Sequence, residues 1–285
     1  MLVAVATLGG LTFLIAAALV VAQSRLQVET DPRIEPVYEL LPHTDCGACG
    51  HPGCRAFAEA LASGEASPAQ CTVGDADSKA AIAEILSVEV GNVEKVVARL
   101  ACAGGANVAR MHAYYEGLSS CRGAALVAGG GKGCFWGCLG LGDCEVVCDF
   151  DAISMSAENL PVVDDDLCTA CGDCVDACPK DLFSLHPVSH RLWVACKNLE
   201  FGDPVLAECE VACTGCGKCA KDASAGLIAM QDNLAVIDYS RQHDQRQAID
   251  RCPTGAIVWF GENGPEKGPA ARKVIRHTRR TVAPT

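Results

Sequence analysis

The sequence predicts an α+β protein built from several small units in series, preceded by an N-terminal transmembrane helix. Three features support this fold class: an apolar stretch at residues 2–22, tight groups of cysteines, and short apolar segments after two of these groups, at 150–153 and 181–184. The 20 cysteines among 285 residues cluster at spacings of two and three residues, which suits metal binding better than a disulfide framework. Units held together by metal can be far smaller than ordinary domains.

Residues 168–179 are the most informative segment, because their cysteines follow the pattern C-x2-C-x2-C-x3-C-P. In bacterial two-cluster ferredoxins this pattern supplies three ligands to one iron–sulfur cluster and a fourth to another. The alternatives are disulfides or structural zinc, but zinc sites usually pair two C-x2-C knuckles. We therefore predict [4Fe-4S] clusters, held in a reducing compartment.

A second group of cysteines lies upstream and makes the two halves look like one repeated unit. Its spacing departs from the standard pattern, because Leu141 stands where a cysteine is expected. Cys134 or an enlarged loop must then complete that cluster. Crossed ligation predicts two sets of ligands. They are Cys134, Cys138, Cys144 and Cys178 for one cluster, and Cys148, Cys168, Cys171 and Cys174 for the other.

The apolar stretch at 2–22 carries no charged residue. Its 21 residues, as a helix rising about 1.5 Å per residue, would span a hydrocarbon layer of roughly 30 Å. The alternative is a cleaved signal peptide, but no basic segment precedes the apolar residues. Arg25 and Arg33 follow, so the positive-inside rule predicts a single-pass protein of the cytoplasmic (inner) membrane with its cluster domains in the cytoplasm.

Residues 42–71 carry four cysteines with the spacing C-x2-C-x4-C-x16-C. Glycines between them allow tight turns around a cluster, and an alanine-rich helix predicted at 55–63 returns the chain to the last cysteine. A zinc knuckle is the alternative. The predicted [4Fe-4S] ligands are Cys46, Cys49, Cys54 and Cys71.

The segment 209–252 begins and ends like a ferredoxin-like domain but lacks its central cysteines. The positions where the repeat requires them hold Ala223, Gln242, Gln245 and Ala248. These four would all bind the same cluster of a crossed pair. We infer that this domain kept one cluster and lost the other. The remaining ligands are Cys213, Cys216, Cys219 and Cys252.

Four further cysteines have no clear assignment. Cys102 and Cys121 are either core thiols or ligands, and the sequence favours the former. Cys196 also stays unassigned. Cys209 and Cys134 each lie four residues before the next cysteine, which allows a shared structural role.

These motifs predict the following organisation. Residues 1–24 are a transmembrane anchor, 25–41 a connector, 42–90 the four-cysteine module, 91–131 a connecting region ending in a glycine hinge, 132–190 a two-cluster ferredoxin-like domain, 191–260 a degenerate ferredoxin-like domain with one cluster, and 261–285 a basic tail. Within them, 79–87 is predicted as a helix and 93–101 as a strand.

Composition and motifs also limit the function. With 23 basic and 35 acidic residues the net charge is −12, which argues against a nucleic-acid partner. No dinucleotide fingerprint, P-loop or nucleophile elbow is present in the sequence. A cluster bound by four cysteines has no open coordination position, so the chemistry expected is electron exchange. We therefore expect about four clusters in an electron-transport subunit that is not catalytic alone.

The order of these features resembles the B subunit of the Rnf electron-transport complex. The resemblance rests on the C-x2-C-x4-C-x16-C module, the AALVAGGG run at 124–131, the GCLGLGDC run at 137–144 and the ferredoxin pattern at 168–179. It implies a membrane-anchored iron–sulfur subunit of a translocase that moves electrons between ferredoxin and NAD and couples this to sodium or proton transport. The implied partners are other membrane and peripheral subunits, soluble ferredoxin and the membrane.

The resemblance also implies ligands, and the chain departs from the family at two places. Asp149 follows Cys148 where proline is usual, and the C-terminal domain lacks four ligands. Two other functions stay open: an iron–sulfur protein with a site-differentiated catalytic cluster of the corrinoid-associated type, and a redox sensor. The ligands implied are Cys46, Cys49, Cys54, Cys71, Cys138, Cys144, Cys148, Cys168, Cys171, Cys174 and Cys178.

Overall fold

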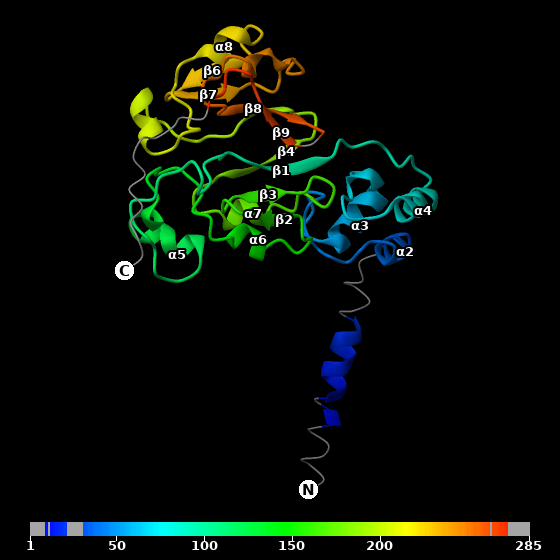
Figure 1. The fold of residues 1–285 in the computed structure, drawn as a ribbon. Coiled ribbons are helices and arrows are strands. Elements are labelled where there is room, and N and C mark those ends of the chain that lie inside the picture. Colours follow the sequence, from blue (N-terminus) through cyan, green and yellow to red (C-terminus); the bar gives the residue numbers. More distant parts are fainter. Residues whose placement is uncertain (1–8, 11, 22–30, 263, 273–285) are drawn as a thin grey trace. The chain divides into compact units, whose positions relative to one another are not determined.

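The computed structural model describes residues 9–10, 12–21, 31–262 and 264–272 (Figure 1). Contacts divide the chain into two compact units, Met1–Gly91 and Asn92–Thr285. Each unit is described separately below.

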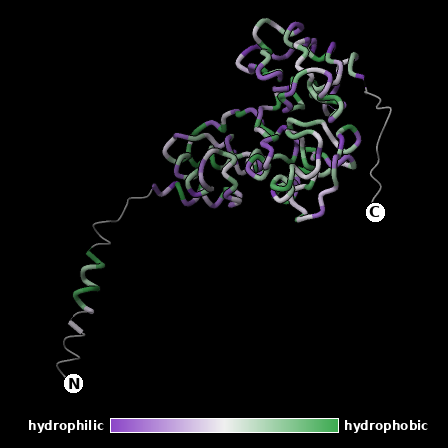
Figure 2. Tube along the Cα trace, turned by 90° about the vertical axis from the view of Figure 1, so that its left-hand side faces the viewer, coloured by the Kyte–Doolittle hydropathy of each residue, from purple (hydrophilic) through white to green (hydrophobic). Residues whose placement is uncertain are grey.

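The transmembrane helix predicted for 1–24 requires a correction. Most of the described helical residues 12–21 are apolar (Figure 2). Across the described ranges, no helix combines the length and the apolar character that crossing a membrane requires. The predicted fold class is therefore wrong in this element. Residues 1–8, 11 and 22–30, which the predicted anchor and connector also include, lie outside the described residues.

Three α-helices and a short 3₁₀ turn form the cysteine-containing part of the first unit. They are α2 (Ile34–Glu39), α3 (Cys54–Ser63), η1 (Pro68–Gln70) and α4 (Ala76–Leu86). Helix α3 ends at Gly64, whose left-handed backbone (φ 81°) favours glycine. Its apolar side, including Phe57 and Leu61, packs against α2 and α4. The helices predicted at 55–63 and 79–87 are thereby confirmed.

The first half of the second unit is built around four strands and two short helices. Two antiparallel strand pairs flank two short helices that carry cysteines (Figure 1). The strand predicted at 93–101 is confirmed as β1, and it pairs with β4 so that Leu100 lies opposite Phe183. The elements are β1 (Val96–Leu100), α6 (Asp143–Val146), β2 (Ile153–Met155), β3 (Pro161–Val163), α7 (Asp173–Ala177) and β4 (Phe183–Pro187).

The second half of this unit, residues 192–267, has the same strand pairing and is called the C-terminal repeat below. Strand β5 pairs with β8, as β1 pairs with β4, and β6 pairs with β7, as β2 pairs with β3. In both halves the strand that follows the Cys-Pro pair returns to the first strand. The elements are β5 (Leu192–Val194), η3 (Asp203–Ala207), α8 (Lys218–Asp222), β6 (Ile228–Gln231), β7 (Leu234–Ile237), η4 (Arg246–Ile249), β8 (Ile257–Gly261) and β9 (Gly264–Lys267).

The glycine run predicted as a hinge forms a closed turn. It follows α5 (Cys121–Leu126) and lies in η2 (Ala128–Gly131), where all three glycines have positive φ values of 68–77°. The carbonyl of Gly131 accepts hydrogen bonds from the backbone N–H groups of His112 (2.7 Å) and Ala113 (3.3 Å). These two hydrogen bonds therefore connect residues 112–113 to the end of the glycine turn.

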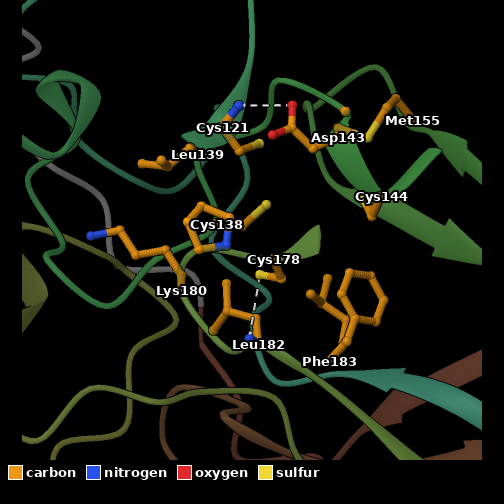
Figure 3. Close-up of a pocket in the computed structure, with 13 residues that line it drawn as sticks. Cys121, Cys138, Leu139, Asp143, Cys144, Met155, Cys178, Lys180, Leu182 and Phe183 are labelled. Atoms are coloured by element: carbon orange, nitrogen blue, oxygen red, sulfur yellow. Dashed lines mark hydrogen bonds between the residues drawn. The ribbon is translucent and has the colours of Figure 1, made fainter. Parts of the chain in front are cut away.

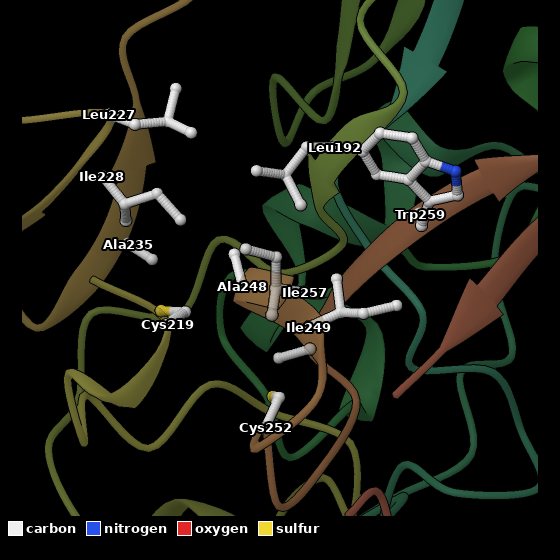
Figure 4. Close-up of a cluster of buried hydrophobic side chains, with 11 residues drawn as sticks. Leu192, Cys219, Leu227, Ile228, Ala235, Ala248, Ile249, Cys252, Ile257 and Trp259 are labelled. Carbon is white, nitrogen blue, oxygen red and sulfur yellow. The ribbon is translucent and has the colours of Figure 1, made fainter. Parts of the chain in front are cut away.

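An apolar core in the second half of this unit contains one of the four positions at which the repeat rule expects a cysteine. Ala248 is buried at 2% exposure beside Ile249, and both belong to an apolar cluster that includes Leu227 and Ile257 (Figure 4). Nearby, the Ser224 hydroxyl donates a hydrogen bond to Gln245 Oε1 (2.9 Å). Of the four positions at which the repeat rule expects a cysteine, Ala248 is therefore part of the apolar core, whereas Gln242 and Gln245 are exposed.

Removing a buried side chain from this core should destabilise the repeat. We expect Ile249→Ala to lower the free energy of unfolding by roughly 2–5 kcal/mol, because Ile249 is fully buried and its loss leaves a cavity. The control Val236→Ala, at a side chain 38% exposed, should cost under about 1 kcal/mol. Urea unfolding of the anaerobic, metal-loaded protein, followed by circular dichroism, measures both. Equal losses would show that this core is not closely packed.

Candidate iron–sulfur sites

Four cysteines surround a pocket between α5, α6 and the start of β4 (Figure 3). The pocket has about 370 Å³ of empty space, counted to its open mouth. Three of its cysteines belong to the predicted set, but the fourth is Cys121 rather than Cys134. The cysteines are Cys121, Cys138, Cys144 and Cys178.

Asp143 holds Cys121 at this pocket. Its carboxylate accepts hydrogen bonds from the backbone N–H groups of Cys121 (2.8 Å) and Arg122 (3.1 Å). Because Asp143 is the residue before Cys144, this pair of bonds fixes the start of α5 against the start of α6. The fourth cysteine is therefore supplied from a segment 17 residues upstream of Cys138.

Cys134 lies at a different pocket, since the backbone N–H of Gly133 bonds to the carbonyl of Arg110 (2.9 Å) and draws this segment away. Sequence reasoning favoured a core role for Cys121 and assigned its place to Cys134. The pocket that Cys134 lines contains three more cysteines without a sequence-based assignment, namely Cys102, Cys196 and Cys209.

Crossed ligation predicted two sets of cysteines in the first half of the second unit, whose two pockets are called the ferredoxin-like pair below. The second of these sets lines one pocket, as crossed ligation requires. This pocket has about 320 Å³ of empty space and lies between β1, β2 and α7. Helix α7 starts after Gly172, whose left-handed backbone (φ 96°) turns the chain so that cysteines on both sides of it face the pocket. The cysteines are Cys148, Cys168, Cys171 and Cys174.

The predicted set of the C-terminal repeat also lines one pocket, of about 370 Å³. Cys219 comes from α8 and Cys252 from the segment before β8, and both border the apolar core of this repeat (Figure 4). The cysteines are Cys213, Cys216, Cys219 and Cys252.

In the first unit, the four predicted cysteines belong to the turns around α3. Cys54 and Cys71 are buried in one apolar cluster against which Cys49 packs. The Asp45 carboxylate accepts the backbone N–H of Cys54 (2.6 Å) and thereby orders the loop that begins with Cys46. Burial raises the pKa of the Cys49 thiol, and the neighbouring Cys71 and Cys46 thiols raise it further.

Backbone N–H groups point at several of these sulfurs. Cys178 Sγ accepts from Leu182 (3.4 Å), Cys168 Sγ from Ala98 (3.4 Å) and Cys71 Sγ from Gly74 (3.3 Å). Such donors stabilise negative charge on thiolate sulfur and raise the reduction potential of a bound cluster. The surroundings therefore suit thiolates bound to metal.

Burial raises the pKa of the thiols that line the pockets. The pKa values of Cys138, Cys144, Cys174 and Cys219 are each raised to about 12, mainly by desolvation. Without metal these side chains are protonated at neutral pH, and binding iron must release their protons. Within the described ranges, no group of three or more His, Cys, Asp or Glu side chains is arranged to hold a single metal ion.

Known families match both parts of the chain. A family model described as "Putative Fe-S cluster" matches residues 41–73, and a model described as "4Fe-4S dicluster domain" matches residues 136–182. The first contains the four cysteines around α3. The second contains seven of the eight cysteines that line the two ferredoxin-like pockets.

Curated relatives match nearly the whole chain. The B subunit of the Na⁺-translocating ferredoxin:NAD⁺ oxidoreductase complex of Acetobacterium woodii is 40% identical over 92% of this chain and 79% of its own length. The B subunit of the ion-translocating oxidoreductase complex of Methanosarcina acetivorans is 37% identical over 89% and 96%. The B subunit of the proton-translocating ferredoxin:NAD⁺ oxidoreductase complex of Clostridium ljungdahlii is 38% identical over 90% and 91%.

The chain belongs to the family of B subunits of the ion-translocating oxidoreductase (Rnf) complexes. The resemblance drawn from its motifs is thereby confirmed. Its cofactors are [4Fe-4S] clusters, as both family models and the cysteine-lined pockets indicate.

Loss of the Asp143 carboxylate should loosen the pocket that contains Cys121. We expect Asp143→Ala to speed iron loss to a chelator by about tenfold or more, because a hydrogen bond to a charged group contributes roughly 1.5–3 kcal/mol and about 1.4 kcal/mol corresponds to tenfold. Asp149→Ala, an exposed acidic residue after the same helix, serves as the control. Anaerobic chelation followed by absorbance measures both rates. Equal rates would rule out the positioning role of Asp143.

Proposed function

We propose that this chain relays electrons between ferredoxin and NAD-linked partner subunits of an ion-translocating oxidoreductase complex, and that it is not catalytic alone. The observation that carries the proposal is the series of cysteine-lined pockets along the second unit. The relatives' names support the partners, since two of them are subunits of ferredoxin:NAD⁺ oxidoreductase complexes. Membrane association would come with membership of an ion-translocating complex.

The proposed ligands form four sets. Three of the sets lie in the second unit and one in the first. They are Cys46, Cys49, Cys54 and Cys71; Cys121, Cys138, Cys144 and Cys178; Cys148, Cys168, Cys171 and Cys174; and Cys213, Cys216, Cys219 and Cys252.

When bound by four thiolates, a [4Fe-4S] cluster exchanges single electrons and offers no open position to a substrate. The chain itself supplies the thiolates, the N–H groups directed at sulfur and an apolar surrounding that limits water. Leu100, Leu182 and Phe183 form such a surrounding at the pocket of Cys121. These residues tune potential and protect the clusters, which is the role expected of a relay.

Two of the sites share their supporting elements. Cys144 lies in α6 and lines one pocket, while Cys148, just after the same helix, lines the other. Cys174 in α7 lines the pocket of Cys148, whereas Cys178, just after α7, lines the pocket of Cys144. Each short helix therefore contributes to both sites, which keeps them close together.

Reduction by ferredoxin tests the proposed function. We expect chemically reduced ferredoxin to bleach the visible absorbance of the anaerobically purified protein within seconds, without NAD⁺. Adding NAD⁺ to the reduced chain alone should yield no NADH, because the sequence carries no dinucleotide fingerprint. NADH formation by the isolated chain, or no bleaching by reduced ferredoxin, would contradict the relay role.

Iron analysis tests the C-terminal set. Cys252→Ala should lower iron and acid-labile sulfide by up to about four per chain, because a [4Fe-4S] cluster needs four cysteines. Thr254→Val, which changes a buried neighbour of Cys252 but no thiol, should leave both values unchanged. Unchanged iron in Cys252→Ala would mean that this repeat holds no cluster.

A further inference from the structure

A fourth cysteine-lined pocket in the second unit belongs to none of the sets above. It has about 320 Å³ of empty space, within the range of the other three pockets. None of its cysteines falls within the segments matched by the two family models, which cover 41–73 and 136–182. The cysteines are Cys102, Cys134, Cys196 and Cys209.

Backbone hydrogen bonds bring these four distant cysteines together. The N–H of Ala103 bonds to the carbonyl of Ala195 (3.0 Å), which joins the residues after Cys102 to those before Cys196. An isolated antiparallel bridge pairs Ala109 with Cys209. A second bridge, between residues 111 and 132, continues this ladder toward Cys134. Secondary structure thus fixes their convergence.

The backbone at Gly104 approaches two of the sulfurs. A Cβ atom at this position would lie 3.0 Å from Cys209 Sγ, a tight contact, and 3.7 Å from Cys102 Sγ, an ordinary one, so glycine leaves Cys209 Sγ more room than a larger residue would. The Gly104 N–H donates a hydrogen bond to Cys102 Sγ (3.4 Å), and the Asn198 N–H donates to Cys196 Sγ (3.5 Å). These are the same N–H to sulfur bonds that occur at the other sites.

Two more N–H donors come from cysteines of the neighbouring sites. Cys138 donates its backbone N–H to Cys102 Sγ (3.4 Å), and Cys213 donates its backbone N–H to Cys196 Sγ (3.3 Å). Cys138 lines the pocket of the ferredoxin-like pair, and Cys213 lines that of the C-terminal repeat. The additional pocket therefore lies between these two sites.

A lysine also borders the pocket. Lys132 Nζ donates to the carbonyls of Gly104 (2.6 Å) and Cys138, which bonds it to one wall of the pocket and to a cysteine of the next site. Its positive charge offsets part of the negative charge of four thiolates.

We propose that Cys102, Cys134, Cys196 and Cys209 bind a further [4Fe-4S] cluster, located between the ferredoxin-like pair and the C-terminal repeat. This inference depends on the proposed function only for the type of metal group, a [4Fe-4S] cluster. It assigns all 20 cysteines of the sequence to sets of four, and it gives Cys134 and Cys209 the shared role that their matching positions allow.

The test is iron, sulfide and zinc analysis of the full-length, anaerobically purified protein. We expect about 20 irons per chain, and a loss of about four in the double variant Cys102→Ala/Cys209→Ala, because each [4Fe-4S] cluster uses four cysteines. The double variant Cys134→Ala/Cys209→Ala should also lose about four, since both residues then serve one cluster. A reduced-state EPR spectrum should show weaker spin–spin interaction in each variant, as a cluster between two others is removed.

Val205→Ala is the control for packing. Val205 is fully buried in the apolar cluster that contains Cys209, so its truncation disturbs the same region without removing a thiol. Iron should stay at the wild-type value. Cysteine-to-serine versions, which change volume little, repeat the test if the alanine variants give little protein.

Several results would overturn the proposal. The first is about 16 irons in the wild type with no change in Cys102→Ala/Cys209→Ala, and the second is one zinc per chain that this variant loses. The third is a loss of about eight irons in Cys134→Ala/Cys209→Ala, since each cluster holds four irons. The last result would return Cys134 to the site of Cys138. Each of these leaves the relay role intact, whereas absence of iron at every site would refute the proposed function itself.

Discussion

The arrangement of four thiols around each pocket is the constraint on which the rest of this structure depends. The strands of the second unit are three to five residues long and its α-helices four to six, which is too short for elements of this kind to be stable alone. Apolar clusters in this unit are correspondingly small. Metal–thiolate bonds close the loops between these elements and convert binding free energy into folding free energy.

The C-terminal repeat shows how this fold is packed where the predicted cysteines are absent. Its strand pairing is that of the first repeat, and Ala248, at one of the four positions where the repeat rule expects a cysteine, packs with Ile249 in an apolar core. Ser224 and Gln245 satisfy each other by a hydrogen bond. A salt bridge between Arg251 and Asp222 links the segment before Cys252 to the end of α8. Packing and polar pairs can thus preserve one half of a ferredoxin-like fold.

Sequence reasoning predicted which cysteines share a pocket where spacing and a repeat rule apply, and it missed a cysteine that a contact between separate segments brings in. The sets containing Cys168 and Cys213 follow from spacing and a repeat rule, and each lines one pocket. Cys121 could not be found in this way, because the carboxylate of Asp143, a contact between separate segments, brings it to its pocket. The transmembrane helix predicted from the apolar stretch at 2–22 is a second limit, since among the described residues no helix is long and apolar enough to cross a membrane.

Position alone gives the additional pocket an influence on its neighbours. The N–H groups of Cys138 and Cys213 are directed at sulfurs of Cys102 and Cys196, so residues of two sites share hydrogen bonds with a third. A change of charge at one set of thiolates therefore alters the backbone that carries the next. Lys132 adds a fixed positive charge at the same junction. Because charge and N–H donors set cluster potentials, these contacts would make the potentials of adjacent sites interdependent.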